Sequence, residues 1–259
     1  MTDRDHLLQE AREPRQVGAG PSFTIESGLF TPASHDSSRS LFAPLHYEPG
    51  YAYPLLVWLH GPDADEGQLL RIMPIVSMRN YVAVAPRGLS IVRRGCNGEK
   101  LDWPQTPEHV YEAEQRVFEA VAAARERYNI AEQRVFLAGF DSGGTMAFRI
   151  AMGHPRRFGG VLSLAGRFPH GYAPFSQLTE ARRLPVFLCV CRDSRQYSPV
   201  DACADLRLLH TAGMSVMLRQ YPCGHELMPM MLRDLDRWII DQITSGQDRC
   251  AEAFREERA

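Results

Sequence analysis

The chain has 259 residues, of which 44% are hydrophobic, and this is enough for one sizeable core. Its 29 basic and 31 acidic residues are mixed along the sequence and give a net charge of −2, which excludes a strong field for collecting nucleic acid or an anionic membrane surface. No stretch is apolar for long enough to span a bilayer, and no apolar run follows a basic start as in a secretory signal. The six cysteines lack metal-site or paired spacing, which is typical of reduced thiols, so we predict a cytoplasmic protein.

Charge and apolar content divide the sequence into three predicted parts. Residues 1–20 are rich in charge and end in Gly-Ala-Gly-Pro, so we expect a mobile or helical lead. Residues 21–246 carry the regular apolar segments and are predicted to form one domain. Residues 247–259 are polar, and we expect them to form a tail.

After two strand-like segments, short apolar segments alternate with longer amphipathic ones from residue 54 onward. In chain order, the predicted elements are strands at 22–30, 39–46 and 54–59, a helix at 66–77, a strand at 80–85, a helix at 108–128, a strand at 134–138, a helix at 143–153, strands at 159–165 and 185–191, a helix at 199–212, a strand at 215–221 and a helix at 228–244. This alternation predicts an α/β fold with a mostly parallel central sheet and helices on both faces. The segment before the strand at 185–191 is too short for a multi-helix cap.

Three glycine-containing turns follow predicted strands, where sheets of this kind place their sites. They are His60-Gly61-Pro62, Gly139-Phe140-Asp141-Ser142-Gly143 and Gly224-His225-Glu226. A strand that enters a Gly-x-nucleophile-x-Gly turn and leaves as a helix is a nucleophile elbow, because glycines allow a turn too sharp for side chains. With Asp193 after the strand at 185–191, the chain order is nucleophile, acid, histidine. In this arrangement His225 is the general base and Asp193 orients its imidazole.

The same turns carry a resemblance to a known family. The runs PLLVWLHG, RVFLAGFDSGGTMAFRIA and RQYPCGHE, together with Trp103, resemble the phospholipase/carboxylesterase family of α/β-hydrolases over roughly residues 40–245. The resemblance implies hydrolysis of carboxylic esters or thioesters by a Ser-His-Asp triad, an ester or related small molecule as partner, and no metal or organic cofactor. Around the elbow we predict substrate-binding residues, which are His60, Gly61, Pro62, Asp63, Trp103 and Gly143.

The sequence departs from this family at the nucleophile. With Gly139 and Gly143 as the flanking glycines, Asp141 takes the nucleophile position. If Ser142 were the nucleophile, Phe140 would stand where the tight turn needs a glycine. We therefore predict that Ser142 supplies the backbone N–H that follows the nucleophile.

Two further departures concern the oxyanion hole and the acid. The family takes one oxyanion donor from the N–H of the residue after His-Gly, which here is Pro62, and proline has no N–H. Loss of one such donor typically costs about 100-fold to 1,000-fold in turnover. The family pattern His-Gly-x-x-Asp places the acid one residue later than Asp193. Asp193 can therefore act as the acid only if the loop shifts it forward by one residue.

Three hypotheses stay open on the sequence alone. The fold is retained without a working nucleophile, as in a binding or interaction protein; Ser142 and His225 form a weakly active esterase; or Asp141 attacks a saturated carbon, as in haloalkane dehalogenases and epoxide hydrolases. Attack by Asp141 on a carboxylic ester gives an anhydride and expels the better nucleophile, so this chemistry runs uphill. The sequence predicts a carboxylesterase-like hydrolase with an atypical active site, and whether it is active stays open.

Overall fold

The computed structural model describes residues 38–91 and 100–256, with side chains as far as residue 245. The predicted lead at 1–20 and the predicted strand at 22–30 lie outside these residues. None of the helices in the described part combines the length and the apolar character needed to cross a bilayer.

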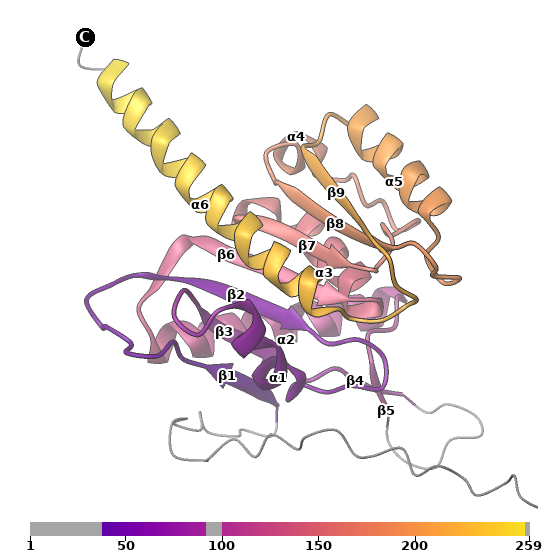
Figure 1. Cartoon of the computed structure of the whole chain (residues 1–259), viewed down its shortest axis with the longest axis horizontal. Helices are drawn as coiled ribbons and strands as arrows, with labels where there is room; N and C mark the ends of the chain where they lie inside the picture. Colours follow the sequence, from indigo (N-terminus) through magenta and orange to yellow (C-terminus); the bar gives the residue numbers. More distant parts are fainter. Residues whose placement is uncertain (1–37, 92–99, 257–259) are drawn as a thin grey trace, which may run out of the picture. The chain divides into compact units, whose positions relative to one another are not determined.

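A seven-stranded sheet forms the centre of the fold (Figure 1). Its strands are β1 Arg39–Phe42, β2 Tyr53–Leu59, β3 Val82–Pro86, β6 Ile130–Phe140, β7 Gly160–Leu164, β8 Val186–Cys191 and β9 Val216–Tyr221. They lie side by side in the order β1, β3, β2, β6, β7, β8, β9. β1 runs antiparallel to β3, and the other neighbouring pairs are parallel. The predicted α/β class with a mostly parallel sheet is confirmed.

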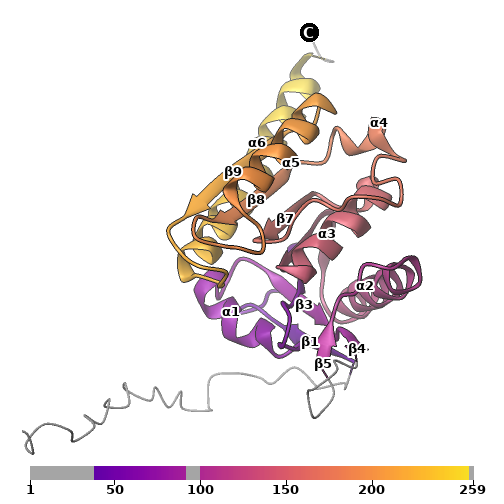
Figure 2. The same cartoon turned by 90° about the vertical axis from the view of Figure 1, so that its right-hand side faces the viewer.

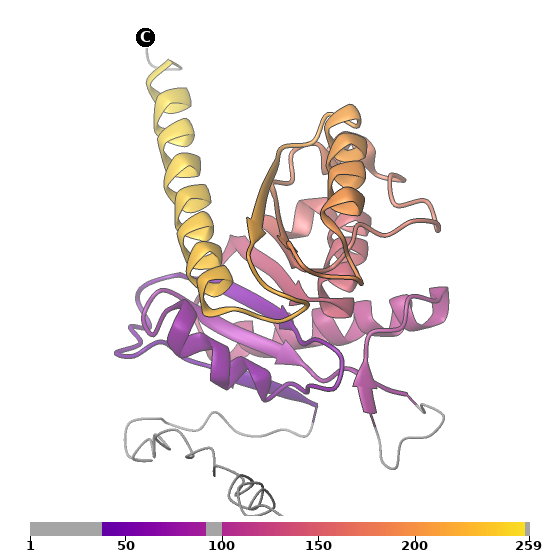
Figure 3. The ribbon, with the colours of Figure 1, turned by 45° about the vertical axis from the view of Figure 1, so that its right-hand side comes forward.

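Helices cover both faces of this sheet. They are α1 Gln68–Val76, α2 Pro107–Arg127, α3 Ser142–Gly153, α5 Pro199–Thr211 and α6 Pro229–Glu256. α2 and α3 pack together on one face (Figure 2), and α1 packs against α6 on the other. Figure 3 shows α5 and α6 on opposite sides of β8 and β9. The prediction of helices on both faces is also confirmed.

The central strand β2 shows why both faces are apolar. Leu55, Val57 and Leu59 join a core cluster with side chains of α2, α3 and α5. Leu56 and Trp58 point the other way and join a second cluster with side chains of α1 and α6. All five side chains are fully buried. A parallel strand buried on both faces reads as one continuous apolar run, and PLLVWL is such a run.

Some features differ from the predicted elements. α6 continues to Glu256, past the predicted end at 244 and into the predicted tail, because residues 247–256 contain no proline and are mostly good helix formers. β1 is shorter than the predicted strand at 39–46. Four short elements have no predicted counterpart: the antiparallel pair β4 Leu89–Ile91 and β5 Lys100–Asp102, the 3₁₀ turn Pro155–Arg157, and the four-residue helix α4 Leu178–Ala181. In the described chain α4 is the one helix between β7 and β8, so no large cap is present there.

Candidate active site

The carboxyl ends of four parallel strands carry the residues of the site. His60 follows β2, Asp141 follows β6, Ser194 comes after β8 and His225 after β9. Because the strands are parallel, these ends meet at one edge of the sheet, where crevices commonly hold ligands. Residues far apart in the sequence are therefore neighbours at this edge.

Asp141 stands at the apex of the sharp turn between β6 and α3. Its backbone has φ 52° and ψ −119°, a conformation that residues with side chains rarely adopt. A Cβ atom on Gly139 would lie 2.4 Å from the carbonyl carbon of Gly143, and one on Gly143 would lie 2.4 Å from the carbonyl oxygen of His60. Both positions require glycine, and the two glycines place Asp141 between them at the apex.

Ser142 is turned toward a different partner. It is the first residue of α3, and its hydroxyl donates a hydrogen bond of 2.5 Å to Oδ1 of Asp102. The same carboxylate oxygen accepts the backbone N–H of Trp103 at 2.8 Å. Both ring nitrogens of His225 contact other residues, so the structure does not bring Ser142 and His225 together.

The imidazole of His225 approaches the apex carboxylate. Its Nε2 atom lies 2.8 Å from Oδ2 of Asp141, and the histidine and aspartate side chains are 13% and 28% exposed. The ring nitrogen is not aligned on this oxygen as a hydrogen bond requires, so the contact is electrostatic. The ring of Phe140 lies 5.7 Å from the imidazole between centroids and also packs against Gly61. The pair therefore sits in a partly desolvated place, where charge interactions are stronger than in water.

The other ring nitrogen of His225 faces a serine. Its Nδ1 atom lies 2.9 Å from Oγ of Ser194, a buried residue. Asp193, the predicted acid, instead accepts two hydrogen bonds from the guanidinium of Arg192, at 2.9 and 3.0 Å on the exposed surface. These hydrogen bonds lower the pKa of Asp193. The structure thus brings Ser194, and not Asp193, to the imidazole.

Backbone hydrogen bonds between two loops explain this placement. The N–H of Arg192 donates to the carbonyl oxygen of Tyr221 at 2.8 Å, and the N–H of Asp193 donates to that of Cys223 at 3.0 Å. The loop after β8 is therefore fixed against the loop after β9 and has no slack to advance Asp193 by one residue. Sequence reasoning missed Ser194, although the one-residue offset from the family pattern was a signal for it.

His60 and Trp103 support the site from the interior. His60 is fully buried, and its Nδ1 lies 2.8 Å from the carbonyl oxygen of Gly61 while its Nε2 accepts the N–H of Gly88 at 3.1 Å. Because a carbonyl oxygen only accepts, the ring carries its proton on Nδ1, and burial lowers its pKa. The buried indole of Trp103 donates to the carbonyl oxygen of His60 at 2.9 Å. These two predicted binding residues hold the His-Gly turn in place.

The predicted oxyanion region has limited donors. Pro62 follows the His-Gly turn and offers no N–H. Asp63 has a φ of 59°, and its carboxylate binds the ammonium group of Lys100 at 2.5 Å. The backbone N–H of Ser142 lies in the first turn of α3, where the helix provides no acceptor, so it is a candidate donor to a ligand.

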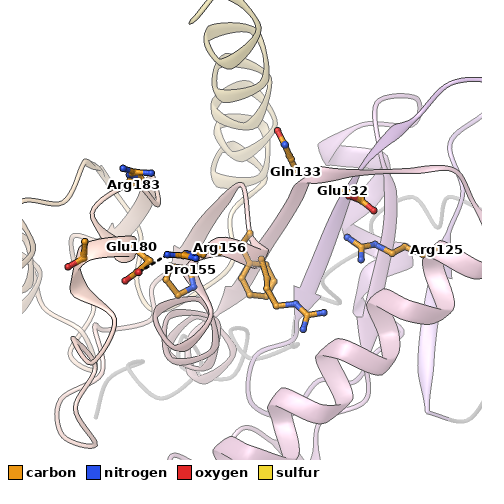
Figure 4. A pocket seen from close by; sticks show the side chains of 10 residues that line it. Arg125, Glu132, Gln133, Pro155, Arg156, Glu180 and Arg183 are labelled. Atoms are coloured by element: carbon orange, nitrogen blue, oxygen red, sulfur yellow. Dashed lines mark hydrogen bonds and ion pairs between the residues drawn. The ribbon is translucent and has the colours of Figure 1, made fainter. Parts of the chain in front are cut away.

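A large surface hollow lies away from this site. It has a volume of about 690 Å³ and is lined by residues near the amino ends of β6, β7 and β8 and the end of α2 (Figure 4). Its side chains include Arg125, Arg183 and Arg156, which pairs with Glu180 at 2.9 Å. None of the predicted site residues lines it, so the site is located by the Asp141–His225 contact and not by cavity size. Within the described ranges, no three potential metal-binding side chains converge.

Solved structures that share this fold include esterases. The carboxylesterase of Bacillus cereus aligns with a TM-score of 0.62 and 16% sequence identity, over 79% of this chain and 93% of that one. SOBER1 of Arabidopsis thaliana aligns with a TM-score of 0.63 and 20% identity, over 74% of this chain and 100% of that one. At these identities the likeness shows the fold alone.

Sequence comparison extends the likeness to a family. The "Putative esterase NocK" of Nocardia uniformis subsp. tsuyamanensis is 30% identical over 165 residues, which cover 61% of this chain. The aligned part spans 46% of that protein's length, so the chain matches about half of it. A model of the Phospholipase/Carboxylesterase family matches residues 54–243, most of the chain, in agreement with the resemblance in sequence. The chain belongs to the phospholipase/carboxylesterase family of α/β-hydrolases.

Proposed function

We propose that this chain binds a small ester or related molecule without cleaving it through a serine nucleophile. The observation that carries the proposal is the 2.8 Å contact between Oδ2 of Asp141 and Nε2 of His225. It occupies the place where a serine hydrolase of this family has its nucleophile and base. A carboxylate there cannot cleave a carboxylic ester productively, because the anhydride it would form is less stable than the ester.

The serines near the site do not replace the missing nucleophile. The hydroxyl of Ser142 is committed to Asp102. Ser194 contacts the histidine, but it is 6% exposed, and its Oγ accepts the backbone N–H groups of Gln196 and Tyr197 at 3.2 and 3.1 Å. A nucleophile must reach the substrate carbon, and neither hydroxyl is free to do so.

Covalent labelling tests the absence of a serine mechanism. The folded wild type, Ser142→Ala and His225→Ala are treated with a fluorophosphonate and examined by intact mass and peptide mapping. We expect no adduct in any of the three and no turnover of p-nitrophenyl butyrate above the rate in buffer. An adduct on Ser142 that disappears in His225→Ala contradicts the proposal and identifies a working serine esterase.

Ligand binding is measured apart from turnover. A molecule that binds the native state raises Tm as its concentration rises. We expect p-nitrophenyl butyrate to raise the Tm of the wild type and to be consumed no faster than in buffer alone. His225→Ala should lose the shift, whereas His210→Ala, at an exposed position on α5, should keep it. Absence of a shift in the wild type, or consumption of the ester above the rate in buffer, overturns the proposal.

The apex carboxylate also favours a second candidate, hydrolysis at a saturated carbon. A carboxylate oxygen of Asp141 would displace a halide or open an epoxide, and water would then attack the carbonyl carbon of the resulting ester. The alcohol leaves with one of the original carboxylate oxygens, and the oxygen atom of the water stays in the regenerated carboxylate. A single turnover in H₂¹⁸O with a haloalkane and epoxide panel therefore labels the peptide that contains Asp141 if this candidate is right. An unlabelled peptide with unchanged substrates excludes it for that panel and favours the binding function.

A further inference from the structure

We infer that Asp141 and Ser194 hold His225 in the tautomer that carries its proton on Nε2, so that the basic nitrogen, Nδ1, faces Ser194 and not the elbow apex. Ser194 is a positioning residue in this arrangement. The inference rests on the proposed function, since it concerns the same histidine and explains why the apex has no general base.

The hydrogen bonds around Ser194 determine whether Nδ1 of His225 carries a proton. A serine hydroxyl has two lone pairs and one hydrogen. Oγ of Ser194 accepts the N–H groups of Gln196 and Tyr197, which uses both lone pairs. Its hydrogen is left for Nδ1 of His225 at 2.9 Å, so Nδ1 accepts.

The apex carboxylate selects the same tautomer from the other side. The carboxylate of Asp141 offers only lone pairs. A lone pair on Nε2 at 2.8 Å from Oδ2 would be repelled, whereas an N–H at that distance is attracted even when it is not aligned for a hydrogen bond. Both neighbours therefore place the ring proton on Nε2.

This arrangement is the reverse of a Ser-His-Asp triad. There, the carboxylate binds the N–H at Nδ1, and the lone pair on Nε2 faces the nucleophile. Here a carboxylate stands at the apex, and a hydroxyl, that of Ser194, stands where the family pattern places the acid. A serine introduced at the apex alone would face an N–H of His225 and would not be activated.

The role of Ser194 is tested in the background Asp141→Ser, where the apex carboxylate no longer biases the ring. The full chain is labelled with ¹⁵N, and long-range ¹H–¹⁵N correlation spectra at alkaline pH report which nitrogen of His225 is protonated. Three proteins are compared: Asp141→Ser, Asp141→Ser/Ser194→Ala and Asp141→Ser/Ser194→Asp. His225→Gln in the wild type assigns the signals.

Each variant has a distinct expected tautomer. Asp141→Ser keeps the proton on Nε2, because the hydroxyl of Ser194 still donates to Nδ1. Adding Ser194→Asp moves the proton to Nδ1, since a carboxylate only accepts, and adding Ser194→Ala gives a mixture. A proton on Nδ1 in Asp141→Ser, or identical spectra with and without Ser194→Ala, overturns the inference.

Reactivity gives a second readout. A general base contributes about 100-fold or more to such reactions, so Asp141→Ser/Ser194→Asp should react with a fluorophosphonate about 100-fold faster than Asp141→Ser alone. Asp141→Ser/Ser198→Ala is the matched control, because the Ser198 hydroxyl caps α5 next to the same loop. Equal rates in the first two variants count against the inference. An adduct in the wild type, by contrast, defeats the proposed function and leaves the tautomer result standing.

Discussion

At the scale of single residues, the backbone conformation of Asp141 leads to a stability prediction that does not depend on its carboxylate. A φ of 52° with ψ −119° is strained for any residue with a Cβ, and such strain costs about 1 to 3 kcal/mol. Asp141→Gly and Asp141→Ala both remove the carboxylate, so the difference between their free energies of unfolding measures the backbone strain at this position. We expect the glycine variant to have the higher free energy of unfolding in urea, by about 1 kcal/mol. An alanine variant of equal or greater stability would show that the turn relaxes.

The buried His60 predicts a dependence of stability on pH. Its pKa lies below the ordinary value of 6.5, so the unfolded chain takes up a proton there while the native ring stays neutral. The free energy of unfolding should therefore fall as pH drops below about 6.5 and be fully retained above it. In urea titrations across this pH range, the free energy of unfolding of His60→Gln should vary less with pH than that of the wild type. The control His210→Gln, at an exposed position, should keep the wild-type slope, and equal slopes in all three proteins contradict the assignment.

Part of the site could be predicted from sequence because it depends on local sterics. The spacing of Gly139 and Gly143 places Asp141 at the apex with no knowledge of the rest of the fold. The partner of Nδ1 depends on how two loops lie against each other, through hydrogen bonds between residues about thirty apart in the chain. Arg192 stands next to Asp193 and binds its carboxylate at the surface, so the predicted acid does not reach His225.

At the scale of elements, a glycine-to-alanine substitution should have opposite effects on stability at the two ends of α3. A Cβ on Gly143 would lie 2.4 Å from backbone oxygens of Leu59 and His60 in β2 and the turn after it, and backbone cannot move aside easily. Gly143→Ala should lower the free energy of unfolding by about 3 kcal/mol. A Cβ on Gly153 would meet nothing within 4 Å, so Gly153→Ala should raise stability by about 0.5 to 1 kcal/mol. Urea unfolding of the two variants measures both, and similar effects would mean that α3 shifts away from β2.

The elements that sequence reasoning locates are those whose pattern is set by burial. β2, β7 and β8 are short apolar runs, and their observed bounds lie within one residue of the predicted ones, whereas β6 begins four residues before the predicted strand at 134–138 because its first part is polar. The pair β4 and β5 is different. Each strand has three residues, and each is defined by pairing with the other and not by its own apolar content. Such pairing cannot be seen in local composition.

At the scale of the whole molecule, the order of strands in the sheet brings the site together. β2 and β6 are neighbours, so the His60 turn meets the elbow, and β8 and β9 are neighbours at the other side, so Ser194 meets His225. The alternation of helices and strands predicts a parallel sheet with a site at its carboxyl edge. It does not by itself predict which loops touch, because this depends on strand order.

The glycine contacts that shape the elbow have a consequence for how the active site can change during evolution. They involve backbone atoms of β2, β6 and α3 and no atom of the Asp141 side chain. A substitution at the apex can therefore change the chemistry of the site while the backbone turn that supports it is kept. A family built on such a turn can give rise to members with different or no catalytic roles through very few substitutions.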